Sequence, residues 1–181
     1  GLLYTDINHL NEITLNDELD GSMLYYNPNL NFNGEDSFSF SVSDGFSSAD
    51  AIYSINILPI NDNPIAIDIV SPLELDEDTP IEISISGSDV ENDILNFNIA
   101  SLPGNGFITN NDGALLDINS TISGIENSDE NVYQTTLVYT PNLNFIGEDS
   151  FSFIISDMSE NNSLSNIVTI NLLINQVNDA P

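Results

Sequence analysis

Two short runs of the chain group acidic and amide side chains at spacings that suit metal binding. They are Asn61-Asp62-Asn63-Pro64 and Asp89-Val90-Glu91-Asn92-Asp93. Alternate carboxylates on a turn can direct several oxygens toward one point, and Ca²⁺ takes about six to eight oxygen ligands. With no Cys and a single His, the chain has few ligands for softer metals. The two runs together predict a calcium site, whereas each run alone is equally typical of an ordinary solvated turn.

The charge balance also calls for a cation. The chain has 29 Asp and Glu residues and no Lys or Arg, so its formal net charge is −29. Its carboxylates must therefore be solvated, protonated or neutralised by metal ions, since no side-chain ammonium or guanidinium is present. Nucleic acid is excluded as a partner and anionic lipid is disfavoured, because both are bound through basic residues. Adaptation to a saline habitat is the alternative explanation of the acidity.

The arrangement of the acidic residues does not favour catalysis. Glu35-Asp36 and Glu148-Asp149 are adjacent pairs on expected strands, where neighbouring side chains point to opposite faces and cannot flank one glycosidic bond. His9 is the only imidazole, and nothing in the sequence places it in a Ser-His-Asp triad. We therefore expect a protein that is not an enzyme.

The elements that must position these residues belong to a repeat. Residues 26–40 return as residues 139–153, and both copies continue to a Ser-Asp pair, at Ser43-Asp44 and Ser156-Asp157. Each copy then runs through an apolar strand to a polar turn that ends in proline, at Pro64 and Pro181. The period is about 113 residues at the motif and about 117 at the proline. Residues 1–63 are thus predicted to be the C-terminal part of a first repeat without its N-terminal strands, and residues 64–181 a complete second repeat that ends in a linker.

Apolar residues recur at a period of two in six segments of the chain. The alternating sets are Phe38, Phe40 and Val42; Tyr53, Ile55 and Ile57; Ile81, Ile83 and Ile85; Leu95, Phe97 and Ile99; Phe151, Phe153 and Ile155; and Val168, Ile170 and Leu172. This period indicates strands with one buried face, and the Asn, Asp, Gly and Pro clusters between them indicate turns. The predicted fold is all-β, with antiparallel Greek-key β-sandwich repeats in tandem. No apolar run approaches the length of about 18 residues that a membrane-spanning helix needs.

The order of these motifs resembles that of bacterial cadherin-like tandem repeats. Residues 34–64 are similar to the second half of such a repeat, with an acidic motif, an Asp-Gly turn and a linker like D-x-N-D-N-x-P. Residues 77–97 are similar to the first half, with an early Glu and a D-x-D-like turn. The closing Asn178-Asp179-Ala180-Pro181 is typical of the bacterial members. Pro59 stands in place of the first linker Asp and Glu91 in place of the second turn Asp, so one or two ions per linker are expected.

The resemblance implies a set of calcium ligands. Asn61 and Asn63 would offer carbonyl oxygens to an ion shared with Asp89, Glu91 and Asp157. Asp62 would bridge toward ions held by Glu35 or Asp36, and a half-site at the other end would await the next repeat. That half-site would comprise Glu77, Glu148, Asp149 and Asp179. The complete predicted set is Glu35, Asp36, Asn61, Asp62, Asn63, Glu77, Asp89, Glu91, Asp93, Glu148, Asp149, Asp157 and Asp179.

The resemblance also implies a role. We expect a calcium-rigidified structural or adhesive module of a large extracellular protein or filament on a bacterial cell surface. Its partners would be neighbouring repeats, neighbouring fibre subunits or a cell-surface ligand such as a glycan, without insertion into a membrane. The alternatives are a carbohydrate-binding module, for which the tyrosines would supply stacking platforms, and a non-catalytic domain appended to a secreted hydrolase.

Overall fold

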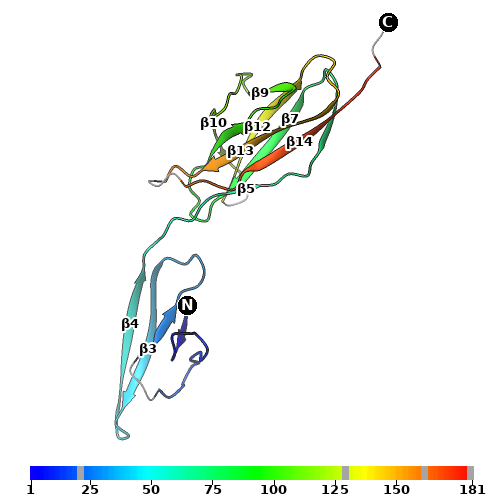
Figure 1. Cartoon of the computed structure of the whole chain (residues 1–181). Helices are drawn as coiled ribbons and strands as arrows, with labels where there is room; N and C mark the ends of the chain where they lie inside the picture. The colour runs from blue at the N-terminus through cyan, green and yellow to red at the C-terminus, as the bar shows by residue number, and fades with distance from the viewer. Residues whose placement is uncertain (20–22, 128–130, 160–162, 179–181) are drawn as a thin grey trace. The chain divides into compact units, whose positions relative to one another are not determined.

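The structure is a computed structural model that describes residues 1–19, 23–127, 131–159 and 163–178. These residues form fourteen strands and no helix, so the predicted all-β fold is confirmed. None of the described segments is a helix long and apolar enough to cross a membrane. The chain divides into two compact units, Gly1–Ile60 and Asn61–Pro181, which are described separately (Figure 1).

The second unit is a β-sandwich of two sheets. One sheet has the strand order β10-β8-β13-β14-β6, and the other has the order β11-β12-β7-β5 with β9 also paired to β12. The strands are β5 (Ile65–Ile67), β6 (Leu73–Asp76), β7 (Ile81–Ser88), β8 (Asn96–Ser101), β9 (Gly106–Asn110), β10 (Thr121–Ser123), β11 (Ile125–Glu126), β12 (Val132–Pro141), β13 (Gly147–Ser156) and β14 (Val168–Asn175).

The core of the second unit lies between these two sheets. The alternating residues of β7, β8, β13 and β14 all turn inward, as their period of two predicts. The largest fully buried side chains are Tyr139, Phe97, Phe151, Phe153, Ile83, Ile85, Leu95, Ile99, Ile108, Leu137, Ile155 and Ile170. The rings of Phe97 and Phe153 pack with their centroids 6.0 Å apart. These contacts hold together the strands whose ends carry the acidic turns.

One strand pair departs from the predicted antiparallel pattern. β6 pairs with β14 in parallel, with Leu73 opposite Leu172 and Leu75 opposite Ile174. The cause is a change of sheet near the start of the unit: β5 pairs with β7 in one sheet, and the chain then joins the edge of the other sheet at β6. The alternation of side chains cannot reveal this, because it is the same in parallel and antiparallel pairs.

The first unit contains two small sheets. β1 (Leu2–Tyr4) pairs with β2 (Tyr25–Asn27), and β3 (Gly34–Ser43) forms a long hairpin with β4 (Ser48–Ile57). The turn before the hairpin repeats the one before β13, since Gly34 and Gly147 have φ angles of 111° and 117°. Such values strain any residue with a Cβ, which explains the glycine in both copies.

The internal repeat provides a matched pair of core substitutions. Phe153 is fully buried in the second unit, whereas its counterpart Phe40 is 41% exposed in the first. We predict that Phe153→Ala lowers the unfolding free energy of the second unit by about 3–5 kcal/mol, because it leaves a cavity. Phe40→Ala should cost less than about 1 kcal/mol. Urea titrations of the two variants check this, and equal losses would contradict the assigned packing.

Candidate metal centre

The 89–93 run forms a tight turn directly after β7, and we call it the acidic turn. Asp89 is only 3% exposed, and its Oδ1 accepts hydrogen bonds from the backbone N–H groups of Glu91 (2.9 Å) and Asp93 (3.2 Å). Asn92 takes a positive φ of 60°, which Asn tolerates better than most residues. The Asp89 side chain therefore sets the shape of the turn by satisfying the backbone donors that follow it.

The second carboxylate oxygen of Asp89 is not satisfied in the same way. Oδ2 is buried and has no hydrogen-bond partner among the described residues. Burial, with a contribution from the carboxylates of Asp93 and Asp157, raises the pKa of Asp89 above its ordinary value. A buried acceptor without a donor is costly, and one that belongs to a charged group is more so. This oxygen marks a place where a positive charge would be stabilising.

Asp157 and Asn61 lie beside Asp89. Asp157 directly follows β13 and is buried, and its Oδ2 accepts a hydrogen bond of 2.8 Å from Nδ2 of Asn61. Burial alone raises the pKa of Asp157, but hydrogen bonds from Asn61 and Ser159 bring it below its ordinary value. The Asn61 Nδ2 also contacts the backbone oxygen of Asp62 at 2.8 Å and Oγ of Ser163 at 3.2 Å. Three oxygens thus surround one amide nitrogen.

Glu91 connects the acidic turn to the first residues of the second unit. Its Oε2 accepts a hydrogen bond of 3.1 Å from the backbone N–H of Asp62. The side chains of Asp62 and Asn63 are exposed, and that of Asp93 is half-buried. The structure therefore brings Asn61, Asp89, Glu91 and Asp157 to one end of the sandwich, with Asp93 next to them on the acidic turn.

These side chains do not already form a closed metal cage. Within the part of the chain that the structure describes, no group of three His, Cys, Asp or Glu side chains is arranged to hold a metal ion. Each of Asp89, Glu91 and Asp157 accepts at least one N–H hydrogen bond within the unit. A cation at this end would need oxygens other than carboxylates, and amide and backbone oxygens are common ligands of Ca²⁺.

Two polar residues near the site were missed by the sequence interpretation. The side-chain amide of Asn166 donates to the backbone oxygen of Ala66 (3.1 Å) and accepts from its N–H (3.0 Å), so it pairs with β5 as a neighbouring strand would. Ser163 contacts Asn61 from the same loop between β13 and β14. Both lie in the insertion that lengthens the second repeat, where the alignment with the first repeat has no counterpart to signal them.

The described residues that were predicted for the half-site do not belong to the acidic turn. Glu148 and Asp157 are nine residues apart along β13 and its end, which corresponds to about 30 Å of extended chain. Glu77 is buried after β6, and its Oε1 accepts a hydrogen bond of 2.8 Å from the backbone N–H of Val177. Asp179 falls outside the described residues. Glu77 therefore fastens the segment that follows β14.

Asp149 accepts hydrogen bonds from several protein donors. Its carboxylate accepts four hydrogen bonds of 2.8–2.9 Å, from the backbone N–H groups of Gly104, Asn105 and Ser150 and from the hydroxyl of Tyr139. Burial and this hydrogen bond raise the pKa of Tyr139. Asp149 is thereby occupied by protein donors and fixes the loop between β8 and β9.

The first unit repeats this pair with Tyr26 and Asp36. The Tyr26 hydroxyl donates to Oδ2 of Asp36 at 2.5 Å. This hydrogen bond is the largest of the causes that lower the pKa of Asp36 to about 2 and raise that of Tyr26 to about 12. Asp36 and Asp149 thus have the same partner at the same spacing. Glu35 is exposed on β3, and Glu148 is exposed on β13. The acidic Glu-Asp pair consequently combines one structural carboxylate with one that faces solvent.

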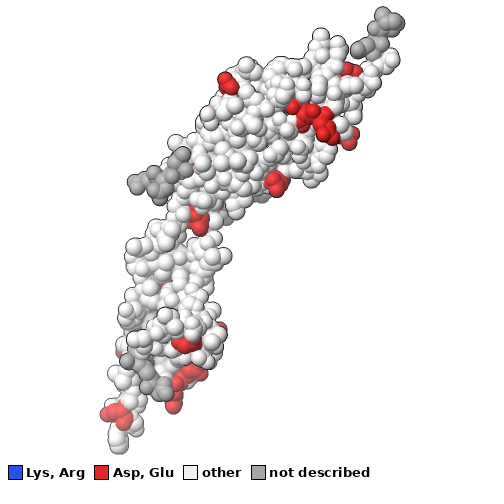
Figure 2. Space-filling view, viewed as in Figure 1, with Lys and Arg blue, Asp and Glu red and all other residues white. Residues whose placement is uncertain are grey.

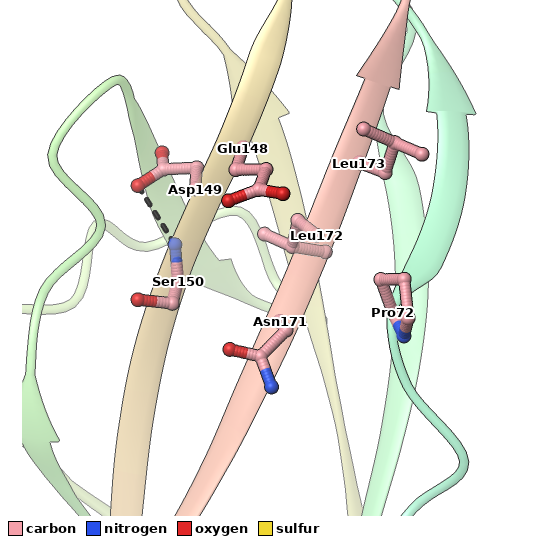
Figure 3. A pocket seen from close by; sticks show the side chains of 7 residues that line it. All are labelled: Pro72, Glu148, Asp149, Ser150, Asn171, Leu172 and Leu173. Atoms are coloured by element: carbon pink, nitrogen blue, oxygen red, sulfur yellow. Dashed lines mark hydrogen bonds between the residues drawn. The ribbon is translucent and has the colours of Figure 1, made fainter.

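The surface near Glu148 confirms that the two carboxylates of the pair diverge. Figure 3 shows Glu148 and Asp149 leaving β13 in different directions, with Asp149 bonded to the Ser150 N–H. A surface pocket here is lined by Pro72, Glu148, Asp149, Ser150, Asn171, Leu172 and Leu173. Adjacent side chains of a strand point to opposite faces, and the grouping of Glu148 with Asp149 in one half-site stays a prediction. Figure 2 shows acidic side chains as separate patches on the visible face.

The assigned role of Asp149 leads to a stability prediction. Asp149→Ala leaves four donors without their acceptor, so the unfolding free energy of the second unit should fall by at least about 2 kcal/mol. Tyr139→Phe removes one donor and should cost about 1 kcal/mol. Both losses should be the same in calcium and in chelator, as measured by thermal denaturation. A loss of stability seen only in the presence of calcium would instead indicate that Asp149 is a metal ligand.

Comparison with known proteins assigns the class. The chain belongs to the bacterial Ig domain family, which matches residues 2–56 and 61–171. No curated protein sequence matches the chain. Similar solved structures include PapD-like domain 7 of human CEP192, with 9% identity over 65% of this chain and 89% of that chain and a TM-score of 0.42.

Two bacterial structures are similar to the same degree. A conjugative transposon lipoprotein from Bacteroides eggerthii has 14% identity over 62% of this chain and 97% of that chain, with a TM-score of 0.42. The CooA pilin subunit from enterotoxigenic Escherichia coli has 9% identity over 63% of this chain and 99% of that chain, with a TM-score of 0.39. At these identities and scores, neither likeness bears on function.

Proposed function

We propose that the chain is a non-catalytic structural module of a bacterial cell-surface protein or filament, and that Ca²⁺ bound at the acidic turn stiffens it. The observation that carries the proposal is the buried Oδ2 of Asp89, which has no donor among the described residues of a chain without Lys or Arg. Membership of the bacterial Ig domain family supports a repeat module. The cadherin-like order of the motifs supports calcium as the ion and a linker as its place.

The donor set at the acidic turn fits a hard cation. For the proposed ion, Asp89, Asp157 and Glu91 would supply carboxylate oxygens, and Asp62 would supply a backbone oxygen. Thiolates are absent from the sequence, and its single histidine, His9, belongs to the first unit. Oxygen-only donors of mixed type are those that Ca²⁺ takes, and zinc prefers nitrogen and sulfur. When bound, the ion would supply the positive charge that the burial of Asp89 calls for.

Asn61 would change its hydrogen bonding when the ion binds. Its Nδ2 now donates to oxygens of Asp62, Asp157 and Ser163. Rotation of the side-chain amide would present Oδ1 instead, which turns the residue from a competitor of the cation into a ligand. The same residue begins the second unit, so an ion at this place would restrain the segment from Asn61 to Pro64.

Calcium should therefore stabilise the second unit through Asp89. A ligand that binds only the folded state adds about 2.7 kcal/mol at a hundredfold excess over its Kd. We expect thermal melts of the wild type to shift upward by several degrees from chelator to millimolar Ca²⁺. Asp89→Asn keeps an acceptor for the N–H groups of Glu91 and Asp93 but lacks the charge, so its increment should drop below about 0.5 kcal/mol.

Glu82→Gln is the matched control for this experiment. Glu82 is exposed on β7, and its substitution removes the same charge without touching the acidic turn. It should retain the full calcium increment. Equal increments in Asp89→Asn and Glu82→Gln would show nonspecific screening of the acidic surface, and no increment in the wild type would refute the metal centre.

Tyr133 allows the position of the ion to be tested directly. It is buried beside the acidic turn, and its hydroxyl contacts the backbone oxygen of Asn92 at 3.4 Å. Tb³⁺, which occupies calcium sites, should show luminescence sensitised by excitation of this tyrosine. Tyr133→Phe should remove most of the sensitised signal, whereas Tyr53→Phe, in the other unit, should leave it intact. Calcium should displace the Tb³⁺, and loss of signal in Tyr53→Phe alone would place the ion elsewhere.

A carbohydrate-binding role is the weaker alternative. Aromatic side chains do gather on the β3–β4 hairpin, where the rings of Phe38 and Tyr53 stack with centroids 5.6 Å apart. Their counterparts in the second unit, Phe151 and Ile170, are fully buried core residues. The aromatic cluster is therefore better explained as part of a core than as a platform for sugars.

A further inference from the structure

Asn61 and Asp62 lie at the acidic turn, although neither residue belongs to a strand. Nδ2 of Asn61 donates to Asp157 at 2.8 Å, and the N–H of Asp62 donates to Glu91 at 3.1 Å. The first strand after them is β5, which begins at Ile65. The position of β5 therefore decides whether the start of the second unit can offer oxygens to the proposed ion.

β5 is an edge strand of three residues, and a side chain covers its outer side. Its middle residue, Ala66, pairs with Gly87 of β7 and is 3% exposed. The N–H of Ala66 donates to Oδ1 of Asn166 at 3.0 Å, and its C=O accepts from Nδ2 at 3.1 Å. Backbone groups of successive residues alternate sides along an antiparallel strand, so Ala66 is the residue of β5 whose groups face away from β7. One side-chain amide thus takes the place of a neighbouring strand.

The inner side of β5 is fixed by its close approach to β7. A Cβ built at Gly87 would lie 2.9 Å from the backbone oxygen of Ile65 and 2.2 Å from Cδ1 of Ile155. Glycine in a strand marks a place where another part of the chain approaches closely, and no larger residue would leave this space. A glycine therefore fixes β5 on one side and Asn166 fixes it on the other.

Asn166 is itself held by the strand that leads to Asp157. Ser165 donates its N–H to the backbone oxygen of Ile155 and accepts the Ile155 N–H at its Oγ, both at 2.9 Å. The Ser165 hydroxyl also donates to the backbone oxygen of Asn166 at 2.7 Å. Ile155 lies in β13, two residues before Asp157. The amide of Asn166 thus connects β5 to the end of β13 that carries one of the proposed ligands.

We propose that Asn166 is a positioning residue of the metal centre. It fixes β5 against the end of β13 and thereby keeps Asn61 and Asp62 within reach of the proposed ion. Its action is indirect, because Oδ1 and Nδ2 of its side chain are both engaged with Ala66. This inference rests on the proposed function, since it assigns a role toward the ion at the acidic turn.

The role requires an amide and not a carboxylate. An amide offers both a donor and an acceptor, whereas an ionised carboxylate only accepts. Asn166→Asp therefore keeps the acceptor for the Ala66 N–H but removes the donor to the Ala66 carbonyl oxygen. The same substitution adds a negative charge to the loop between β13 and β14, which by charge alone favours a cation. The two effects on calcium affinity have opposite signs, so one variant separates them.

Calorimetric titration of the full chain with Ca²⁺ tests the proposal. Asn166→Asp should weaken calcium binding by at least about fivefold, with the number of bound ions unchanged. Asn171→Asp is the matched control, because Asn171 is exposed on β14 and its substitution adds the same charge without touching β5. The control should leave the Kd unchanged.

Amide hydrogen exchange gives a readout that a purely structural role would not change. Coupling between two sites is reciprocal, so an ion whose binding depends on the position of β5 must also stabilise β5. Ca²⁺ should therefore slow exchange of the Ala66 N–H by at least about tenfold in the wild type. In Asn166→Asp the effect of Ca²⁺ on this amide should be much smaller. The amides of β13 and β14 should stay protected in both proteins, which shows that the unit remains folded.

The outcomes distinguish this inference from the proposed function. Absence of calcium binding by the wild type overturns both. Binding by Asn166→Asp that is as tight as that of the wild type, or tighter, overturns the positioning role and leaves the metal centre standing. An Ala66 amide whose exchange does not respond to bound calcium in the wild type has the same meaning, and this measurement decides the matter if the variant does not fold.

Discussion

The absence of every cationic side chain is the constraint on which the rest of this structure depends. With 29 carboxylates and no Lys or Arg, the chain has to satisfy buried acids with backbone N–H groups, hydroxyls and amides. Even the exposed Asp44 accepts such hydrogen bonds, since those from the N–H groups of Ser47 and Phe46 lower its pKa. Asp149 and Asp157 follow the same rule, Asp149 with four hydrogen bonds. In Asp89 only Oδ1 accepts hydrogen bonds, and the buried Oδ2 has no partner among the described residues. For this reason Asp89, rather than the general acidity of the chain, indicates the candidate site.

The all-β class and the core were predictable from the sequence because both follow from a period of two. Inward residues such as Ile83 and Ile170 were identified by alternation, and burial confirms them. The parallel pairing of β6 with β14 was not predictable, because alternation carries no information on strand direction. The small sheet formed by β1 and β2 was also missed, since each of these strands has only three residues.

The candidate site was predictable in part. Residue types and spacing identified the acidic turn and Asn61, and the resemblance to cadherin-like repeats added Asp157, to which Asn61 is hydrogen-bonded. The sequence could not show which carboxylates already accept hydrogen bonds from distant parts of the protein. Asp149 accepts hydrogen bonds from residues 104–105, which lie more than forty residues away in the sequence. No local sequence pattern predicts such contacts. Asn166 was missed for the same reason, as its bond to Ala66 spans 100 residues. Long-range hydrogen bonding thus separates structural carboxylates from available ones.

The parallel pairing of β6 with β14 has a mechanical consequence. β6 lies near the start of the second unit and β14 near its end, so tension applied to the two ends pulls these strands in opposite directions along their axes. The hydrogen bonds between Leu73–Asp76 and Leu172–Asn175 are then loaded together in shear, whereas a hairpin pulled from its open end would break them one at a time. A short parallel contact at the edge of the sheet therefore makes the unit resist stretching more strongly than its length alone would suggest.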